Sequence, residues 1–447
     1  MIIDMEQKIK FLSVSGMLII LLSCKQSIQN FNSHRSPVID KKVVYNESLF
    51  PSYNANYTPP SGMKTFELSQ NYPKTLTIES YPWQNINFIE DPELYMQTVL
   101  SYCLEGNTEI DFRGQENKIR KWYHAPWLHD DGKYLNNEYI GNGREYIHGL
   151  TREFATPKYK IHDRQDIELE NWAVGMYNPP GGYTLGQVWP GPKQNPDPQK
   201  ANFPEGTVSF KLLFTDAPVN KIPFLKNTLE WNGNIYLCNP NTDCSNVIRR
   251  DRTVRLLQID IAVKDKRALK TGWVYGTFIY DGLHTGKTIW ERMVPVGLSW
   301  GNDSNIAKDI HRDGAFINHE LKESFINASL IHPEGKNNKS TYLRYHGLGG
   351  RLNGPIDNPL SSCISCHGNA AVNDQGHTLP LGDFKAGITR SNYPFESFQQ
   401  FFADIAPGAN VIQHKGEAYI TTDYSLQISN GIKNYYANKR ALNSRAK

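Results

Sequence analysis

Two cysteines and a histidine stand close together near the C-terminus, in the segment PLSSCISCHGNA at residues 359–370. Two thiols separated by two residues can each add to a vinyl group of one haem, and a histidine directly after them can reach the iron beneath the ring. The pattern predicts one covalently attached haem c, with Cys363 and Cys366 as thioether anchors and His367 as the proximal iron ligand.

Two other uses of paired cysteines are the alternatives. A structural zinc site needs a second Cys or His pair at short spacing, and the other close pair, Cys238 and Cys244, has five residues between its members. A thioredoxin-like dithiol belongs at the strand-to-helix turn of a βαβ unit, whereas DNPLSS before Cys363 has the composition of a loop. The complete CxxCH spacing favours covalent haem.

The N-terminus has the pattern of an export signal, which haem attachment outside the cytoplasm requires. Lys8 and Lys10 precede an apolar run from Phe11 to Leu22 that is too short to span a bilayer. The run ends in LLSC, which resembles the lipobox of bacterial lipoproteins, so Cys24 is predicted to carry lipid; an ordinary secretory signal is the alternative. We expect a protein of a bacterial cell envelope, anchored through lipid to the outer membrane and facing the periplasm.

The remaining cysteines, the histidines and the net charge limit the chemistry elsewhere. Cys238 and Cys244 flank the turn-rich NPNTD and are expected to form a short-loop disulfide, while Cys103 lies in an apolar run and is expected to be a buried free thiol. His124 and His129 lie among Trp and Tyr without carboxylates at ligand spacing, so they are predicted to be structural. A net charge of +3 over 447 residues predicts no nucleic-acid partner.

Strand patterns are concentrated in the middle of the chain. GTVSFKLLF (206–214) alternates in polarity, and VRLLQIDIAVKD (254–265) and GWVYGTFIYDG (272–282) are two more β-rich runs. Residues 92–105 predict a helix that Gly106 ends. The expected fold class is mainly β, or β-dominated α+β: an antiparallel sheet with a few short helices that carries the C-terminal CxxCH segment as a loop.

Composition divides the chain into six predicted parts. They are a lipoprotein signal peptide (1–24), a polar tether (25–62), an N-terminal extension packed on the core (63–171), a β-sheet core (172–300), a loop-rich insertion (301–358), and a haem-attachment segment with a polar C-terminal tail (359–447). No flexible linker is evident after residue 62, so the later parts are expected to form one globule.

Three segments in this order, FPEGTVSFK, LLQIDIAVKDKRALKTGWVYGTFIY and the late CISCH, resemble the cytochrome P-460 family and its relatives, the cytochromes c′-β. The resemblance covers about residues 172–282 and 360–372. It implies a monohaem protein of mostly β-sheet structure whose haem motif comes late in the chain. This chain departs from the family in the long segment between GTFIYDG and Cys363 and in its N-terminal portion.

The resemblance also implies roles for two residues. In P-460 members, a lysine in the strand that matches GTVSFK is crosslinked to the haem, and Lys211 stands at that place. Members that oxidise hydroxylamine have a carboxylate four residues before the lysine of VKD, which is Asp260 here. The c′-β relatives share the fold without the crosslink, so the crosslink stays open. Without the resemblance, Lys211 would be a solvent-facing strand lysine, and Asp260 would form a buried ion pair with an arginine such as Arg255.

The sixth position of the iron separates the possible functions. No methionine follows the haem motif, which disfavours the usual Met-ligated electron-transfer cytochrome. An open position would bind a small nitrogen species, either hydroxylamine, with Asp260 accepting protons while electrons leave to an unidentified redox partner, or nitric oxide without turnover. The alternative is a six-coordinate electron-transfer cytochrome with His377 or His414 as the sixth ligand. The sequence therefore does not decide between an enzyme and a protein that only binds its ligand.

Overall fold

In the computed structural model, the described residues are 66–77, 79–126, 134–135, 138–139, 144–145, 147–191, 194–236, 249–305, 320–330, 345–380 and 399–445. All of them belong to the second of the chain's two units, Asp40–Lys447. Cys24, His129, Cys238 and Cys244 lie outside the described residues, so the lipid anchor and the disulfide stay predictions.

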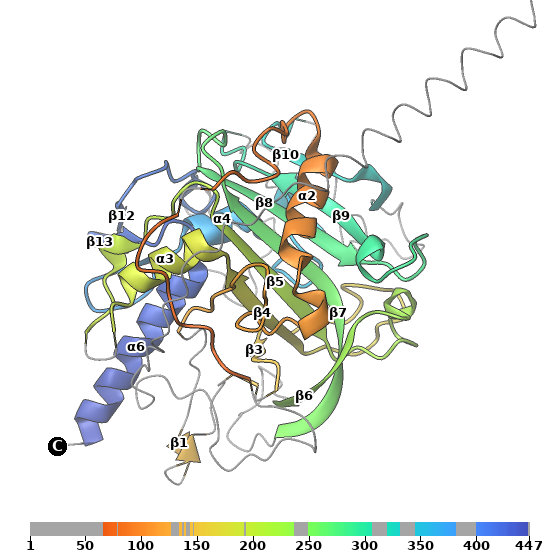
Figure 1. The fold of residues 1–447 in the computed structure, drawn as a ribbon, viewed down its shortest axis with the longest axis horizontal. Coiled ribbons are helices and arrows are strands. Elements are labelled where there is room, and N and C mark those ends of the chain that lie inside the picture. Colours follow the sequence, from red (N-terminus) through yellow and green to blue (C-terminus); the bar gives the residue numbers. More distant parts are fainter. Residues whose placement is uncertain are drawn as a thin grey trace, which may run out of the picture. The chain divides into compact units, whose positions relative to one another are not determined.

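An eight-stranded antiparallel sheet dominates the described part of the chain (Figure 1). In spatial order its strands are β10 (Ser324–Ile326), β9 (Met293–Ser299), β8 (Trp273–Tyr280), β7 (Arg249–Lys264), β5 (Val208–Thr215), β4 (Asn171–Tyr177) and β3 (Thr151–Arg152), and β6 (Glu230–Tyr236) also pairs with β7. The mainly β fold class and the three expected strands are confirmed. Strands β3 and β10 extend the sheet beyond residues 172–300 on both edges.

Smaller elements surround this sheet. A second antiparallel sheet contains β11 (Ala371–Val372), β13 (Glu417–Thr421) and β12 (Val411–His414), and β1 (Tyr134–Leu135) pairs with β2 (Glu138–Tyr139). The α-helices are α2 (Pro92–Leu104), α3 (Pro179–Val188), α4 (Cys363–Gly368) and α6 (Leu426–Arg445). Short 3₁₀ turns occupy Thr108–Ile110, Pro198–Lys200, Pro223–Leu225, Trp290–Arg292, Ala328–Leu330 and Leu348–Gly350. Helix α2 confirms the helix expected at residues 92–105.

The C-terminal tail is not simply a polar tail, because α6 forms most of it. Several asparagines and Gly431 give this segment a low intrinsic helix propensity. Ile428, Ile432 and Tyr435, at spacings of four and three, are nevertheless buried along one stripe. Burial of that stripe against the rest of the protein therefore outweighs the weak propensity. No helix of the described residues is long and apolar enough to cross a lipid bilayer.

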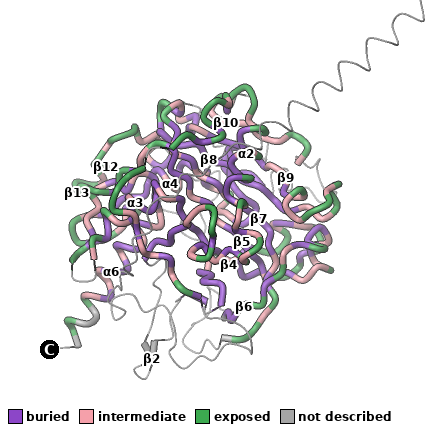
Figure 2. Tube along the Cα trace, in the orientation of Figure 1, coloured by how far each residue is buried: buried purple, intermediate pink, exposed green. Residues whose placement is uncertain are grey.

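The central strands are covered on both faces. Strands β4 and β8 are buried at every residue, as the tube in Figure 2 shows for the centre of the sheet. On the apolar face, Phe210 packs edge-on against Trp122, with ring centroids 4.7 Å apart, and also contacts Phe112. The N-terminal segment thus covers this face. Polar residues that alternate with the apolar ones must then find partners on the other face, because they are shielded from water.

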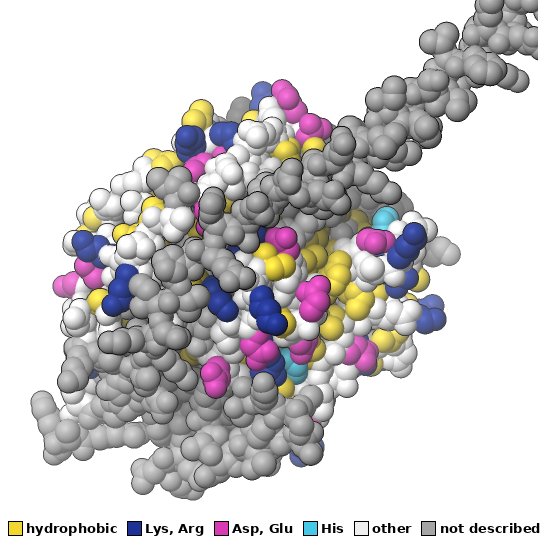
Figure 3. Space-filling model, viewed as in Figure 1, with side chains coloured by type: hydrophobic (Ala, Val, Ile, Leu, Met, Phe, Trp, Pro, Cys, Tyr) yellow, Lys and Arg dark blue, Asp and Glu magenta, His cyan; other side chains and the backbone are white. Residues whose placement is uncertain are grey.

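The outer surface differs from this interior. On the face seen in Figure 3, basic and acidic side chains of the described residues are interspersed rather than gathered into a patch of one sign. The charged side chains of the candidate site instead lie inside the protein, on one face of the sheet.

Candidate functional site

The CxxCH motif forms a short helix rather than the expected loop. Helix α4 begins directly after Ser362, whose hydroxyl accepts from the backbone N–H of Ser365 (3.0 Å), while the Ser365 hydroxyl accepts from the N–H of Ser362 (2.8 Å). This reciprocal cap stabilises a helix of little more than one turn. Cys363, Cys366 and His367 are three and four residues apart, so they share one face of α4.

The two cysteines of α4 are free thiols in partly buried positions. Burial raises the pKa of the Cys366 thiol to about 11 and that of Cys363 well above its usual value. A catalytic dithiol acts as a thiolate and needs the opposite shift in pKa. Among the described residues, no group of three or more His, Cys, Asp or Glu side chains is arranged to hold a metal ion. A c-type haem needs no such group, since its protein anchors are two thioethers and one imidazole.

His367 is held as a metal-ligating histidine would be. Its Nδ1 lies 2.9 Å from the backbone oxygen of Tyr424. A carbonyl can only accept, so Nδ1 carries the proton and the lone pair is on Nε2. Burial lowers the pKa of His367 to about 4, which keeps the imidazole neutral. A neutral ring with one nitrogen bonded to a carbonyl is the usual arrangement of a histidine that ligates a metal. These residues therefore fit a haem.

The register of the sheet brings both residues named from the resemblance to α4. Lys211 on β5 is paired with Asp260 on β7, and Asp260 is paired with Thr277 on β8. Thr277 Oγ1 lies 2.9 Å from Asp260 Oδ1 and 3.9 Å from Cys363 Sγ. We call Lys211, Asp260 and Thr277 the polar row. It crosses three strands and ends against the first cysteine of the motif.

The surroundings of Asp260 disfavour the ionised form of its carboxyl group. Burial raises its pKa to about 7, and the nearby negative charge of Asp357 acts in the same direction against the opposing charge of Lys211. Gln258 Nε2 donates to both carboxylate oxygens, at 2.8 and 3.0 Å, and also to Asp357 at 3.1 Å. A carboxylate with a pKa near neutrality can both accept and release a proton at physiological pH.

The alternative pairing of Asp260 with Arg255 is wrong. Arg255 Nε lies 2.7 Å from Glu230 Oε1, on the neighbouring strand β6. The register explains this result, because β7 pairs with β6 at Arg255 and with β8 at Asp260. The two residues therefore belong to different parts of one long strand.

Lys211 is not a solvent-facing lysine, since only 28% of its side chain is exposed. Its Nζ lies 3.1 Å from Glu153 Oε1. Burial lowers the pKa of Lys211, but the charges of Glu153, Asp260 and Asp357 outweigh burial and raise it above its usual value. The cation also contributes to the low pKa of His367, so Lys211 lies within electrostatic reach of the motif.

None of the hydrogen bonds described joins His377, His414, His124 or Cys103 to α4. His377 is exposed in the turn after β11, where its backbone N–H donates to Asn373 Oδ1 (2.8 Å), and His414 Nδ1 lies 2.7 Å from Gln400 Nε2. These contacts give no support to either residue as a sixth ligand. His124 is fully buried and its Nδ1 accepts from the backbone N–H of Ser69 (3.0 Å), while its Nε2 has no hydrogen-bond partner among the described residues. Cys103 is the expected buried thiol.

Sequence reasoning missed several residues of the site: Glu153, Thr277, Asp357 and Tyr424. Thr277 is a single threonine in a β-rich run, and no pattern distinguishes it. Its position two residues after Tyr275 indicates only that both side chains are on the same face of the strand. The contribution of Tyr424 to His367 is a backbone carbonyl, which no residue type indicates.

Comparisons with protein-family models, with curated proteins and with solved structures found no match to this chain. The resemblance to cytochrome P-460 therefore stays a prediction. A proposal for the function must therefore be based on the arrangement of α4 and the polar row.

Replacing Asp260 by Asn should change how stability depends on pH. The folded protein binds the Asp260 proton more tightly than the unfolded chain, so this stabilisation is complete below about pH 4 and is lost as pH rises towards about 7. The amide side chain of the variant cannot titrate. The melting temperature of the Asp260→Asn variant, relative to the unmodified protein, should therefore rise progressively between about pH 4 and pH 8. Ser209→Ala on the same face of the sheet is the control. If the melting temperatures of Asp260→Asn and the unmodified protein differ by the same amount at every pH, the raised pKa of Asp260 is contradicted.

Proposed function

We propose that this protein is a monohaem c-type cytochrome that oxidises a small nitrogen species, hydroxylamine in the first instance, in the envelope of a bacterium. The observation that carries the proposal is the meeting of α4 with the polar row, where Thr277 contacts both Cys363 and Asp260. Haem bound at α4 would supply an iron to which nitrogen can bind and through which electrons can leave. Lipid attachment at Cys24 belongs to the same proposal.

The attachment itself needs only the residues of α4. Each thiol, at Cys363 and Cys366, would add across one vinyl group: a carbon–sulfur bond would form, the vinyl double bond would be consumed, and the thiol hydrogen would pass to the neighbouring carbon. No electron acceptor is required. His367 would hold the iron through Nε2, while its Nδ1–H donates to the Tyr424 carbonyl.

Asp260 is suited to accept protons during the oxidation. Every electron that leaves hydroxylamine is accompanied by a proton, and a carboxylate with a pKa of about 7 can take it at neutral pH. Gln258 and Thr277 orient the carboxylate by hydrogen bonds, and Lys211 stabilises its ionised form. The electrons go to a one-electron redox protein that this proposal leaves unidentified. A merely gas-holding site has no use for such a proton acceptor.

The protein expressed in a bacterium that exports and assembles c-type cytochromes should contain one covalently bound haem. Mass spectrometry of the denatured chain should show the added mass of one haem, and it should localise to the peptide with Cys363 and Cys366. The double variant Cys363→Ala, Cys366→Ala should lose the covalent haem, while Cys103→Ala, which removes a buried thiol elsewhere, should keep it. Unmodified protein without haem would overturn the proposal.

Replacing Lys211 by Met tests whether it is bonded to the haem. If it is, the ferrous Soret band of the unmodified protein should be strongly red-shifted, and Lys211→Met should return it to the position of an ordinary c-type haem. Glu153→Gln is the control: it removes the charge beside Lys211 but keeps the Lys211 amine, so the red shift of the Soret band should remain. An unshifted band in the unmodified protein excludes the crosslink without excluding the haem.

Replacing Asp260 by Asn should lower the rate of hydroxylamine oxidation by about 10²–10⁴-fold, the usual contribution of a positioned proton acceptor. The haem content should not change. Asp216→Asn is a matched control, because burial also raises the pKa of Asp216, to about 6, and this residue follows β5 away from α4. Full turnover in Asp260→Asn would remove this residue from the mechanism. Tight binding of nitric oxide without any turnover in the unmodified protein would favour a gas-binding protein instead.

A further inference from the structure

We infer that Asp423 is a positioning residue for His367: it fixes the Tyr424 carbonyl that accepts the His367 Nδ1 proton, and so sets the orientation and donor strength of the imidazole. Asp423 lies 56 positions after His367 in the sequence and does not contact the motif through its own side chain in any of the hydrogen bonds described. The inference rests on the proposed attachment of haem at α4. It adds to that proposal a means by which the protein sets the properties of the iron.

The backbone at this point has an unusual conformation. Asp423 and Tyr424 have φ angles of +45° and +66°, so two consecutive residues other than glycine occupy the left-handed region. Aspartate tolerates this region, but a bulky aromatic residue rarely adopts it. Such a conformation persists only where the surroundings hold it in place, and it is found preferentially at functional sites. Its result here is the direction of the Tyr424 carbonyl towards His367.

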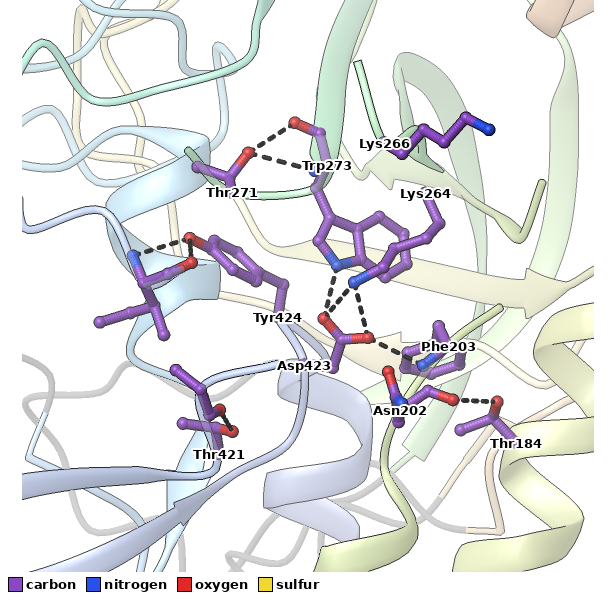
Figure 4. Close-up of polar contacts among 12 residues, drawn as sticks. Thr184, Asn202, Phe203, Lys264, Lys266, Thr271, Trp273, Thr421, Asp423 and Tyr424 are labelled. Carbon is purple, nitrogen blue, oxygen red and sulfur yellow. Dashed lines mark hydrogen bonds and ion pairs between the residues drawn. The ribbon is translucent and has the colours of Figure 1, made fainter. Parts of the chain in front are cut away.

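The side chain of Asp423 is held from three directions, as Figure 4 shows. Lys264 Nζ, at the end of β7, lies 2.6 Å from Oδ1 and 2.9 Å from Oδ2. Trp273 Nε1, at the start of β8, donates to Oδ1 (2.9 Å), and the backbone N–H of Phe203 donates to Oδ2 (2.8 Å). The side chains of Asp423 and Lys264 are each only 11% exposed. Asp423 is thus fixed to the ends of two central strands.

Tyr424 is fixed on its other side. Its hydroxyl donates to the carbonyl of Ile405 (2.8 Å) and accepts from the N–H of the same residue (3.0 Å). Its carbonyl accepts from Tyr275 Oη (3.3 Å) in addition to His367 Nδ1, and the rings of Tyr275 and His367 are 4.8 Å apart. With Asp423 held before it and its own ring held after it, the peptide oxygen has little freedom to turn.

A role in stability alone does not account for this arrangement. Buried ion pairs lose much of their attraction to the cost of desolvation, and apolar residues of similar size often stabilise a fold as well or better. An ion pair is useful where a geometry must be specified. A hydrogen bond from Nδ1–H to a fixed acceptor makes the opposite nitrogen a stronger donor, and loss of such partners typically costs about 10–100-fold in metal affinity or activity.

The test compares Asp423→Asn with a matched control in the haem-containing full-length protein. Asp423→Asn removes the ion pair and leaves too few acceptor positions for both Trp273 and Phe203. The Tyr424 carbonyl should then hold Nδ1–H less firmly, and the weaker donor should favour ferrous iron. We expect the ferric-to-ferrous equilibrium to shift by about 10-fold, which is about 59 mV higher in midpoint potential for one electron. Trp273→Phe removes one of the hydrogen bonds and should give a smaller shift of the same sign.

Asp265→Asn is the control, because the Asp265 side chain is held in the same way and none of its hydrogen bonds among the described residues goes to Asp423, Tyr424 or His367. It forms an ion pair with Arg267 (2.5 Å), accepts from the aromatic hydroxyl of Tyr95 (3.0 Å), and accepts from a backbone N–H (3.1 Å). This variant should lose stability to a comparable extent and keep the midpoint potential of the unmodified protein.

The outcomes separate this inference from the function on which it rests. Absence of covalent haem from the unmodified protein removes both. Haem present in all variants, with the same potential in Asp423→Asn as in the unmodified protein, overturns the positioning role and leaves the proposed function untouched. An equal potential shift in Asp265→Asn also overturns it, because the effect would then be one of general destabilisation. If Asp423→Asn does not fold, an unchanged potential in Trp273→Phe has the same meaning.

Discussion

The burial of the ionisable groups of the polar row between the sheet and α4 is the constraint on which the rest of the site depends. Lys211 and Asp260 lie on neighbouring strands and are both only partly exposed, so water stabilises their charges less than it would at the surface. Each is tolerable only because Glu153, Gln258, Thr277 and the opposite charge surround it. The compensation is incomplete for Asp260, whose pKa stays raised, and an incompletely compensated carboxylate is one that can exchange a proton.

Helix α4 lies between two kinds of support that act on different atoms. On one side, Thr277 of the polar row contacts Cys363; on the other, the Tyr424 carbonyl holds Nδ1 of His367. The first support is made of side chains with charge and protons, which suits chemistry on a bound ligand. The second is a rigid backbone group in a strained conformation, which suits control of an axial ligand. A protein that bound haem only to relay electrons would need the second support but not the first.

Part of this picture could be read from the amino-acid pattern. The alternation in residues 206–214 and 254–265 predicts two strands correctly, since apolar and polar side chains must point to opposite faces. The helical character of α4 and α6 was missed for opposite reasons. Six residues are too few to show a helical period, and the asparagines of α6 mask a buried stripe that only its packing reveals. The alternative ion pair of Asp260 with Arg255 was wrong because pairing depends on which strand lies beside each part of β7.

Lys211 and Asp260 were named only through the resemblance to cytochrome P-460. The amino-acid pattern alone predicted the haem motif, with two thiols and an imidazole at fixed spacing. It could do so because those features depend on residue type and on neighbours a few positions apart. The packing of the whole chain places Lys211 opposite Asp260, brings Thr277 to Cys363 across 86 positions, and brings the Tyr424 carbonyl to His367 across 57. Strand register and the approach of distant backbone groups are properties of the whole packed chain, so no short pattern of residues could have specified them.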